Sequence, residues 1–267
     1  MDGITVFKAI ILGVVEGLTE FLPISSSGHL ILAGELLSVS GEKAKLFEVF
    51  IQLGAILAVI WIYRVKLLSI VKGLASDNKS RILAAGISIA FLPAAVVGLA
   101  THRLIKQYLF SPITVSFALV AGGIVILLIE RMKHKKSFTE LEQVGIKPSF
   151  WIGVAQIFSL FPGVSRSGAT IMGGLLAGLD RKTAAEFSFF LAIPTMFAAT
   201  LFDLAKSYKM LYGGDIKILA VGFAAAFFSA VIVIRWLIKY VSHHDFKVFA
   251  YYRIIFGGAL LLAFFFR

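Results

Sequence analysis

The chain has 267 residues, of which 59% are hydrophobic and only 15% charged, and it contains no cysteine. This composition excludes an ordinary soluble domain, and the absence of cysteine excludes disulfides and thiolate-bound zinc. A net charge of +11 would suggest nucleic acid as the partner of a soluble protein, but the lysines and arginines lie mostly between apolar runs. We therefore expect an all-α integral membrane protein, with no nucleic-acid partner, whose basic residues set the topology and contact lipid headgroups.

The first apolar stretch, about residues 5–37, predicts two short helices rather than one membrane span. Leu22-Pro23 lies midway along it, and proline removes a backbone donor and disfavours helix at the residue before it. Such a re-entrant hairpin is tolerated at membrane depth only where protein or trapped water shields the backbone. Three full spans are expected to follow, near residues 47–63, 82–100 and 113–130.

The same order of elements follows a charged linker, Arg131–Lys147. A second broken segment, about residues 151–178, contains Phe161-Pro162-Gly163 and predicts a second hairpin. Three more spans are expected after it, near residues 186–204, 218–238 and 250–266. Arg253 is expected near the end of the last span, with no particular role.

The two broken segments are copies of one motif. Gly13–Leu37 aligns with Gly153–Ala177 without a gap. The alignment pairs Ser25 with Ser165, Ser27 with Ser167, and Gly28 with Gly168. Weaker matches continue in the same order to the ends of both halves. We therefore predict one membrane domain, residues 1–267, made of two homologous repeats, 1–135 and 145–267.

The number of spans sets the relation of the repeats. A hairpin enters and leaves on one side of the membrane, so three spans per half make the halves point in opposite directions. The repeats should therefore be inverted, with hairpins that enter from opposite faces and meet near the middle. The loops richer in Lys and Arg, within 64–81, 131–147, 181–182 and 235–247, should face the cytoplasm, which places both termini outside.

Glu16 and Glu20 lie four residues apart on one face of the first short helix, inside an apolar run. Ionisable groups at membrane depth usually face a cavity or a partner. Two carboxylates this close repel each other unless a proton or a cation lies between them. The pair could therefore serve as a proton-accepting base, as a divalent-metal site, or as both, and a water-exposed pair without a role is the alternative.

A serine-rich turn follows the first proline. Ser25, Ser26 and Ser27 precede Gly28, and they could cap the second short helix and leave backbone N–H groups free for phosphate. One hydroxyl could attack a phosphorus atom if a base takes its proton. His29 could be that base or a transient phosphate acceptor, or it could be structural.

The second copy of the turn supplies a cation. Arg166 stands where the first copy has Ser26, and a planar guanidinium suits phosphate oxygens. The alternative partner of Arg166 is Glu16 or Glu20, and such an ion pair could also be the empty state of the site. Three hydroxyls surround the arginine in sequence: Ser165, Ser167 and Thr170.

The halves have diverged at the two acids. Gln156 replaces Glu16 and Leu160 replaces Glu20 in the second copy, which favours catalysis over a symmetric transport pore. Three further polar residues interrupt apolar spans: Glu48, Gln52 and Glu186. For these, a hydrogen-bonded structural role and a substrate role are equally open.

The stretches EGLTEFLPISSSGH and PGVSRSGAT together resemble those of the bacterial undecaprenyl-diphosphate phosphatases, the bacitracin-resistance family of integral membrane enzymes. The resemblance extends over essentially the whole chain. It implies hydrolysis of the lipid diphosphate to the monophosphate carrier and inorganic phosphate, which recycles the carrier for cell-wall synthesis. It also implies a multi-pass protein of the bacterial inner membrane, a site open to the outer face, and a divalent cation, Mg or Ca.

Carried onto this chain, the family's acidic motif falls on Glu16 and Glu20, which would hold the cation. The catalytic residues would be Glu20, Ser26, His29 and Arg166. The substrate-binding residues would be Ser25, Ser27, Gly28, Ser165, Ser167 and Thr170. Neither the resemblance nor the residue types decide whether Ser26, His29 or water attacks the phosphorus.

Two other functions are weighed against the phosphatase. A transporter or flippase of the same lipid carrier is the main alternative, because inverted repeats with broken helices are typical of transporters. A structural or assembly protein gives no reason for Glu, Ser, His and Arg to converge at membrane depth. A homodimer is a further expectation.

Overall fold

Helices dominate the structure, a computed structural model that describes residues 4–109, 111–132, 137–207 and 215–265. Within these residues the only extended pairing is an isolated bridge between Phe138 and Leu179. Six helices are long and apolar enough to cross a membrane. They are α3 (Glu42–Ile62), α5 (Asn78–Tyr108), α6 (Pro112–Arg131), α9 (Arg181–Ser207), α10 (Ile216–Val241) and α11 (Lys247–Phe265). The predicted all-α fold and its six candidate spans are confirmed.

The two broken segments form pairs of short helices, as their prolines predict. The first pair is α1 (Val6–Thr19) and α2 (Ser26–Leu36). The second is α7 (Ile146–Ile157), which ends in a 3-10 turn, η2 (Phe158–Leu160), and α8 (Arg166–Leu176). Each second helix begins after a serine with positive φ, 71° at Ser25 and 75° at Ser165. This conformation is uncommon for a residue with a side chain, so the two hairpin tips share an unusual turn.

Two elements were not expected from the sequence. α4 (Arg64–Gly73) continues from α3 and buries none of its residues, and η1 (Leu141–Gln143) lies in the linker. Lys66 of α4 pairs with Glu142 of η1, with 3.0 Å between Nζ and Oε1. The sequence of α4 mixes basic and apolar residues, a pattern that is also typical of a loop next to a membrane span, so the helix was not predicted. Residues 133–136 of the linker, and residue 266 at the expected end of the last span, lie outside the described residues.

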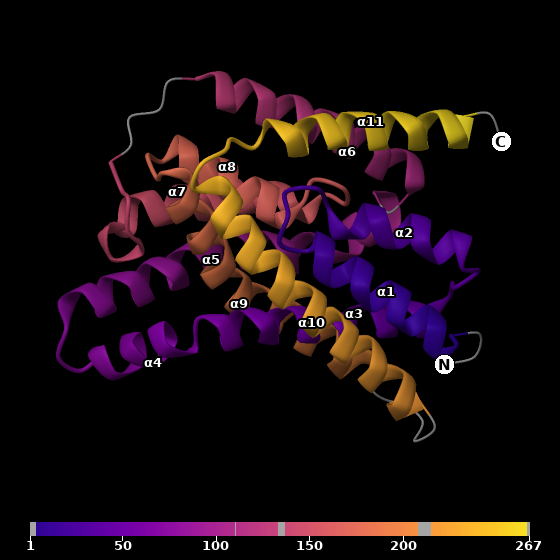
Figure 1. Cartoon of the computed structure of the whole chain (residues 1–267), viewed down its shortest axis with the longest axis horizontal. Coiled ribbons are helices and arrows are strands. Elements are labelled where there is room, and N and C mark those ends of the chain that lie inside the picture. The colour runs from indigo at the N-terminus through magenta and orange to yellow at the C-terminus, as the bar shows by residue number, and fades with distance from the viewer. Residues whose placement is uncertain (1–3, 110, 133–136, 208–214, 266–267) are drawn as a thin grey trace.

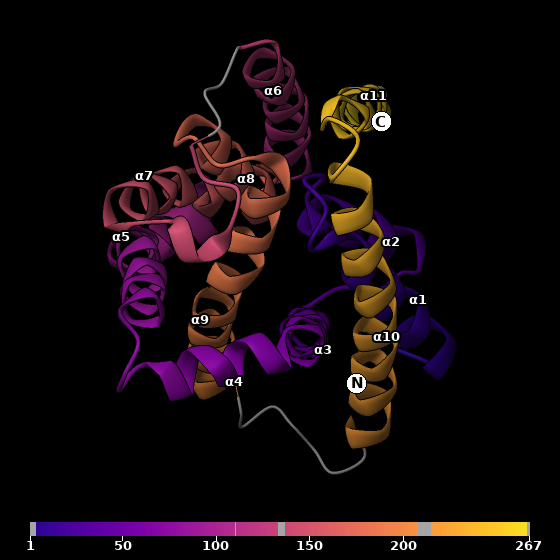
Figure 2. The same ribbon diagram turned by 60° about the vertical axis from the view of Figure 1, so that its left-hand side comes forward.

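Helices from the two halves pack against each other in matching pairs. α1 packs on α10 as α7 packs on α5, and α6 packs on α11. Figures 1 and 2 both show α1 beside α10, and in Figure 1 α6 and α11 run in opposite directions. Glycines permit the close approach, since a Cβ at Gly17 would lie 2.3 Å from the carbonyl oxygen of Ala226 and one at Gly153 2.5 Å from that of Ala90. The hairpins are thereby held between the long helices.

Apolar side chains are both buried and exposed. Phe187 and Phe189 are buried in the core beside the hairpins, whereas Phe117, Phe228 and Ile255 are exposed on the outer faces of the spans. Large exposed apolar faces are unusual in soluble proteins. They are expected where lipid, rather than water, surrounds the helices.

Candidate active site

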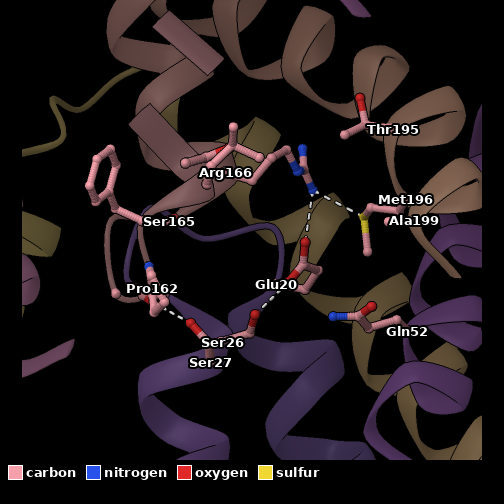
Figure 3. Close-up of a pocket in the computed structure, with 15 residues that line it drawn as sticks. Glu20, Ser26, Ser27, Gln52, Pro162, Ser165, Arg166, Thr195, Met196 and Ala199 are labelled. Carbon is pink, nitrogen blue, oxygen red and sulfur yellow. Dashed lines mark hydrogen bonds and ion pairs between the residues drawn. The ribbon is translucent and has the colours of Figure 1, made fainter. Parts of the chain in front are cut away.

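A cavity of about 270 Å³ lies where the two hairpin tips meet α3 and α9 (Figure 3). The first tip lines it with Glu20, Ser25, Ser26 and Ser27. The second tip lines it with Ser159, Leu160, Phe161, Pro162, Gly163, Ser165 and Arg166. Gln52 comes from α3, and Thr195, Met196 and Ala199 come from α9. The fold therefore brings both copies of the repeated motif to one polar hollow.

Arg166 and Glu20 form an ion pair across this hollow. Arg166 Nη2 lies 3.1 Å from Glu20 Oε1, and the side chains are only 10% and 9% exposed. Arg166 Nη1 also donates to the carbonyl oxygen of Ser188, at 2.9 Å. Its buried Nε has no hydrogen-bond partner among the described residues. A guanidinium with an unused donor beside a cavity can bind a further anionic ligand.

Ser26 donates a hydrogen bond from Oγ to Glu20 Oε2. It is the first residue of α2, so its hydroxyl projects from the tip into the cavity (Figure 3). A hydroxyl that already bonds to a carboxylate can act as a nucleophile, with the carboxylate as its base. Glu20 therefore contacts both Ser26, which could attack, and Arg166, which could hold an anion.

The two tips cap their helices differently. Ser165 Oγ accepts from the backbone N–H of Gly168 at 3.1 Å and so caps α8. Ser25 makes no such side-chain cap for α2, although Ser25 Oγ lies 3.1 Å from Ser27 Oγ, much as Ser165 lies 3.0 Å from Ser167. The first turn of α2 is thus free of the cap that α8 has. Uncapped N–H groups at a helix start attract phosphate oxygens.

Arg253 of α11 joins the two tips. Its side chain is 1% exposed, and Nη1 donates to the carbonyl oxygens of Pro23 at 3.1 Å and Val164 at 2.9 Å. Its other donors reach the carbonyl oxygens of Gly163, Ala118 and Leu119. The expectation that Arg253 lies near a span end without a role is therefore wrong. These contacts could not be predicted from the sequence around Arg253, because the residues that accept its hydrogen bonds lie far from it along the chain.

His29 lies outside the cavity lining. Its Nδ1 is 2.7 Å from the carbonyl oxygen of Ser25, and its Nε2 is 2.7 Å from the hydroxyl of Tyr252. The ring stacks on Tyr252 and Phe256 of α11. Both ring nitrogens are thus engaged away from Glu20 and Arg166.

Three of the six residues predicted to bind substrate line the cavity: Ser25, Ser27 and Ser165. The other three support its walls. Ser167 Oγ donates to the carbonyl oxygen of Leu22 at 2.7 Å, which ties the second tip to the first. Thr170 Oγ1 donates to Ser188 Oγ at 2.7 Å, and Gly28 packs on Leu119.

Glu16 is fully buried and does not line the cavity. Neither of its carboxylate oxygens has a hydrogen-bond partner within the described part of the chain. A buried carboxylate without a partner is costly, so it is expected to bind a proton or a cation.

The contribution of α9 to the cavity was not predicted from the sequence, because Thr195, Met196 and Ala199 are ordinary residues of an apolar span.

Residues 9–259 match the family model of the bacitracin resistance protein BacA. The chain belongs to the BacA family. It is 55% identical to the undecaprenyl-diphosphatase of Nitrosomonas europaea over 262 residues, which cover 98% of this chain and 96% of that protein. It is 52% identical to the undecaprenyl-diphosphatase of Dechloromonas aromatica over 261 residues, with 98% and 95% covered. The family resemblance predicted from the two motifs, EGLTEFLPISSSGH and PGVSRSGAT, is confirmed.

Proposed function

We propose that this BacA-family protein hydrolyses undecaprenyl diphosphate to undecaprenyl phosphate and inorganic phosphate. The relatives that align with it over nearly their whole length are named for this activity. The observation that carries the proposal is the contact of Glu20 with both Ser26 and Arg166 at the meeting of the two tips. The reaction would recycle the lipid carrier for cell-wall synthesis and confer bacitracin resistance.

The proposed reaction begins when the diphosphate enters the cavity. A phosphate oxygen replaces Glu20 as the partner of Arg166, and the N–H groups at the start of α2 bind another oxygen. Glu20 is thereby freed from the ion pair and becomes available as a base. Substrate binding itself would activate the site, because the ion pair occupies the guanidinium only while no phosphate is present.

Ser26 then attacks the terminal phosphorus. Its oxygen forms a bond to phosphorus, its proton passes to Glu20, and the bond to the bridging oxygen breaks to release undecaprenyl phosphate. Arg166 stabilises the charge on the transferring phosphoryl group. Glu20 hands that proton to the departing oxygen of undecaprenyl phosphate and is a carboxylate again. It then takes a proton from water, whose oxygen bonds to the phosphorus while the bond from phosphorus to the Ser26 oxygen breaks, and the proton returns to Ser26 as inorganic phosphate leaves. Direct attack by water, oriented by Ser26, is the close variant.

We assign the attack to Ser26 rather than His29. The hydroxyl of Ser26 faces the cavity and bonds to a carboxylate, whereas both nitrogens of His29 bond outside it. His29 would instead hold the start of α2 in place through its bond to the carbonyl oxygen of Ser25.

A divalent cation, Mg or Ca, is part of the proposal, and Glu16 and Glu20 would hold it. The unpartnered oxygens of Glu16 fit this ligand set, since both ions prefer carboxylate oxygens. No group of three or more Asp, Glu or His side chains suited to a metal occurs in the described residues, so phosphate oxygens would complete the shell. When bound, the cation would offset the negative charge of the diphosphate.

We further propose that residues 1–267 form one domain of two inverted repeats, 1–135 and 145–267. The matching helix pairs and the opposite directions of α6 and α11 support this arrangement (Figure 1). The loops rich in Lys and Arg would face the cytoplasm, and the site would open to the outer face of the inner membrane. A homodimer remains a prediction.

Phosphate release from pure undecaprenyl diphosphate by the detergent-purified protein tests the proposed function. We expect one inorganic phosphate and one undecaprenyl phosphate per substrate consumed. A transporter or flippase of the same lipid would release no phosphate, and that result would overturn the proposal.

A further inference from the structure

Gln52 is a polar residue within the membrane-spanning helix α3, and its side chain lines the cavity. Figure 3 shows its amide directed toward Glu20 and Ser26. The residues beside it on α3, Ile51 and Gly54, are part of apolar packing against other helices. Gln52 is therefore an isolated amide on the wall of a polar hollow.

The other polar groups of that wall already have partners in the protein. Thr195 Oγ1 donates to the carbonyl oxygen of Leu191 at 2.8 Å, and Ser159 Oγ donates to that of Gln156 at 2.7 Å. In contrast, the Gln52 amide forms no hydrogen bond with any residue of the described chain. An amide at membrane depth without a protein partner is costly to keep, and an apolar residue would fit a transmembrane helix better. A ligand in the cavity would supply the missing partner.

The proposed substrate carries two phosphates, and the contacts of Glu20 mark the position of only one of them. Ser26 and Arg166 both contact Glu20, so these three residues mark the position of the terminal phosphate, where the bond breaks. Gln52 reaches the cavity from α3, which belongs to neither tip. An uncharged amide donor suits the phosphate that does not react, because it adds no further charge to the site of transfer.

We propose that Gln52 donates its amide N–H groups to the lipid-linked phosphate of the diphosphate and is thus a substrate-binding residue. This inference rests on the proposed function. The lipid-linked phosphate remains attached to the prenyl chain after cleavage, so the same contact exists in substrate and product. Binding that is equal in the ground state and the transition state changes KM without changing kcat. The product, undecaprenyl phosphate, should therefore bind through Gln52 as well.

Gln52→Met tests the inference, because Met keeps the unbranched shape and removes both donors. We expect KM for undecaprenyl diphosphate to rise about tenfold, with kcat within about twofold of the wild type. The inhibition constant of undecaprenyl phosphate should rise by the same factor as KM. Gln52→Glu keeps the size but places a negative charge beside the phosphate, so both constants should rise further.

Gln143→Met is the matched control, since Gln143 lies exposed in η1 and bonds only within the linker. It should leave all three constants unchanged. Thermal unfolding in detergent identifies any loss of fold, which is not expected when an unpaired amide becomes apolar. A fall in kcat at constant KM, or unchanged KM and product inhibition in both Gln52 variants, would overturn the inference. Such results with an active wild type leave the phosphatase proposal standing, whereas an inactive wild type would contradict that proposal itself.

Discussion

Removing Arg166 perturbs the proposed reaction most directly. Its guanidinium bonds to Glu20 at 3.1 Å and to the carbonyl oxygen of Ser188 at 2.9 Å, and Nε is unused among the described residues. An arginine that stabilises the transferring phosphoryl group contributes about 10³–10⁵ in kcat. Arg166→Ala removes all of its donors, so we expect phosphate release to fall at least about 10³-fold.

The same substitution should also lower stability, for a separable reason. Removing one partner of a buried ion pair costs about 3–5 kcal/mol, because the other charge is left uncompensated. Glu20 keeps its bond from Ser26 and is 9% exposed, so we expect a loss near the lower limit, about 3 kcal/mol or less. Neutralising Glu20 removes the uncompensated charge. Arg166→Ala combined with Glu20→Gln should therefore regain stability and no activity.

Two assays in the same detergent separate these effects: phosphate release from undecaprenyl diphosphate, and thermal unfolding. Arg235→Ala is the control, since Arg235 is exposed on α10 and does not line the cavity. It should retain both activity and stability. Near-normal turnover by Arg166→Ala would refute the role of the guanidinium. A double variant no more stable than the single one would refute the reasoning about the ion pair.

Three further substitutions test the remaining parts of the site. Ser26→Ala should reduce kcat at least about 100-fold and abolish any phosphoenzyme trapped by mass spectrometry, whereas near-normal turnover would assign the attack to water. Arg253→Met should lower the free energy of unfolding by at least about 3 kcal/mol, because carbonyl oxygens of both tips lose their donor; an unchanged unfolding temperature would contradict this. A chelator should inactivate the wild type, and Glu16→Gln should raise the Mg or Ca concentration needed for half-activity at least about tenfold; chelator-resistant activity would exclude the cation.

Local signals in the sequence were sufficient to predict the hairpins and the meeting of their tips. Leu22-Pro23 and Phe161-Pro162-Gly163 break their helices wherever they lie, so both interruptions could be located without a structure. Hydropathy similarly located the six long helices. The gapless alignment of the two motifs then implied that Ser26 and Arg166 occupy equivalent positions. Both are the first residue of a helix in the structure, α2 and α8.

Long-range packing determined what the sequence could not indicate. A lone arginine such as Arg253 looks like a headgroup contact until α6 and both tips are placed around it. His29 follows Ser26 by three residues, yet its ring stacks on Tyr252 and Phe256, more than two hundred residues away in sequence. Which face of α2 meets the cavity depends on how α11 packs, and periodicity within α2 carries no information about α11.

The divergence of the two tips explains why a duplicated motif would give one reaction centre rather than two. Ser26 and Arg166 occupy equivalent positions, but the equivalent of Glu20 is Leu160, which also lines the cavity. The second tip therefore has no base for a nucleophile, and the first tip has no arginine for a phosphate. Under the proposed mechanism neither half could carry out the transfer alone, since the proposed base and nucleophile come from one tip and the guanidinium from the other. A transport pore that alternates between two equivalent states would need each half to perform the role of the other. The two tips are not equivalent in this way, because they differ at Glu20, Ser26 and Arg166, the residues that contact each other.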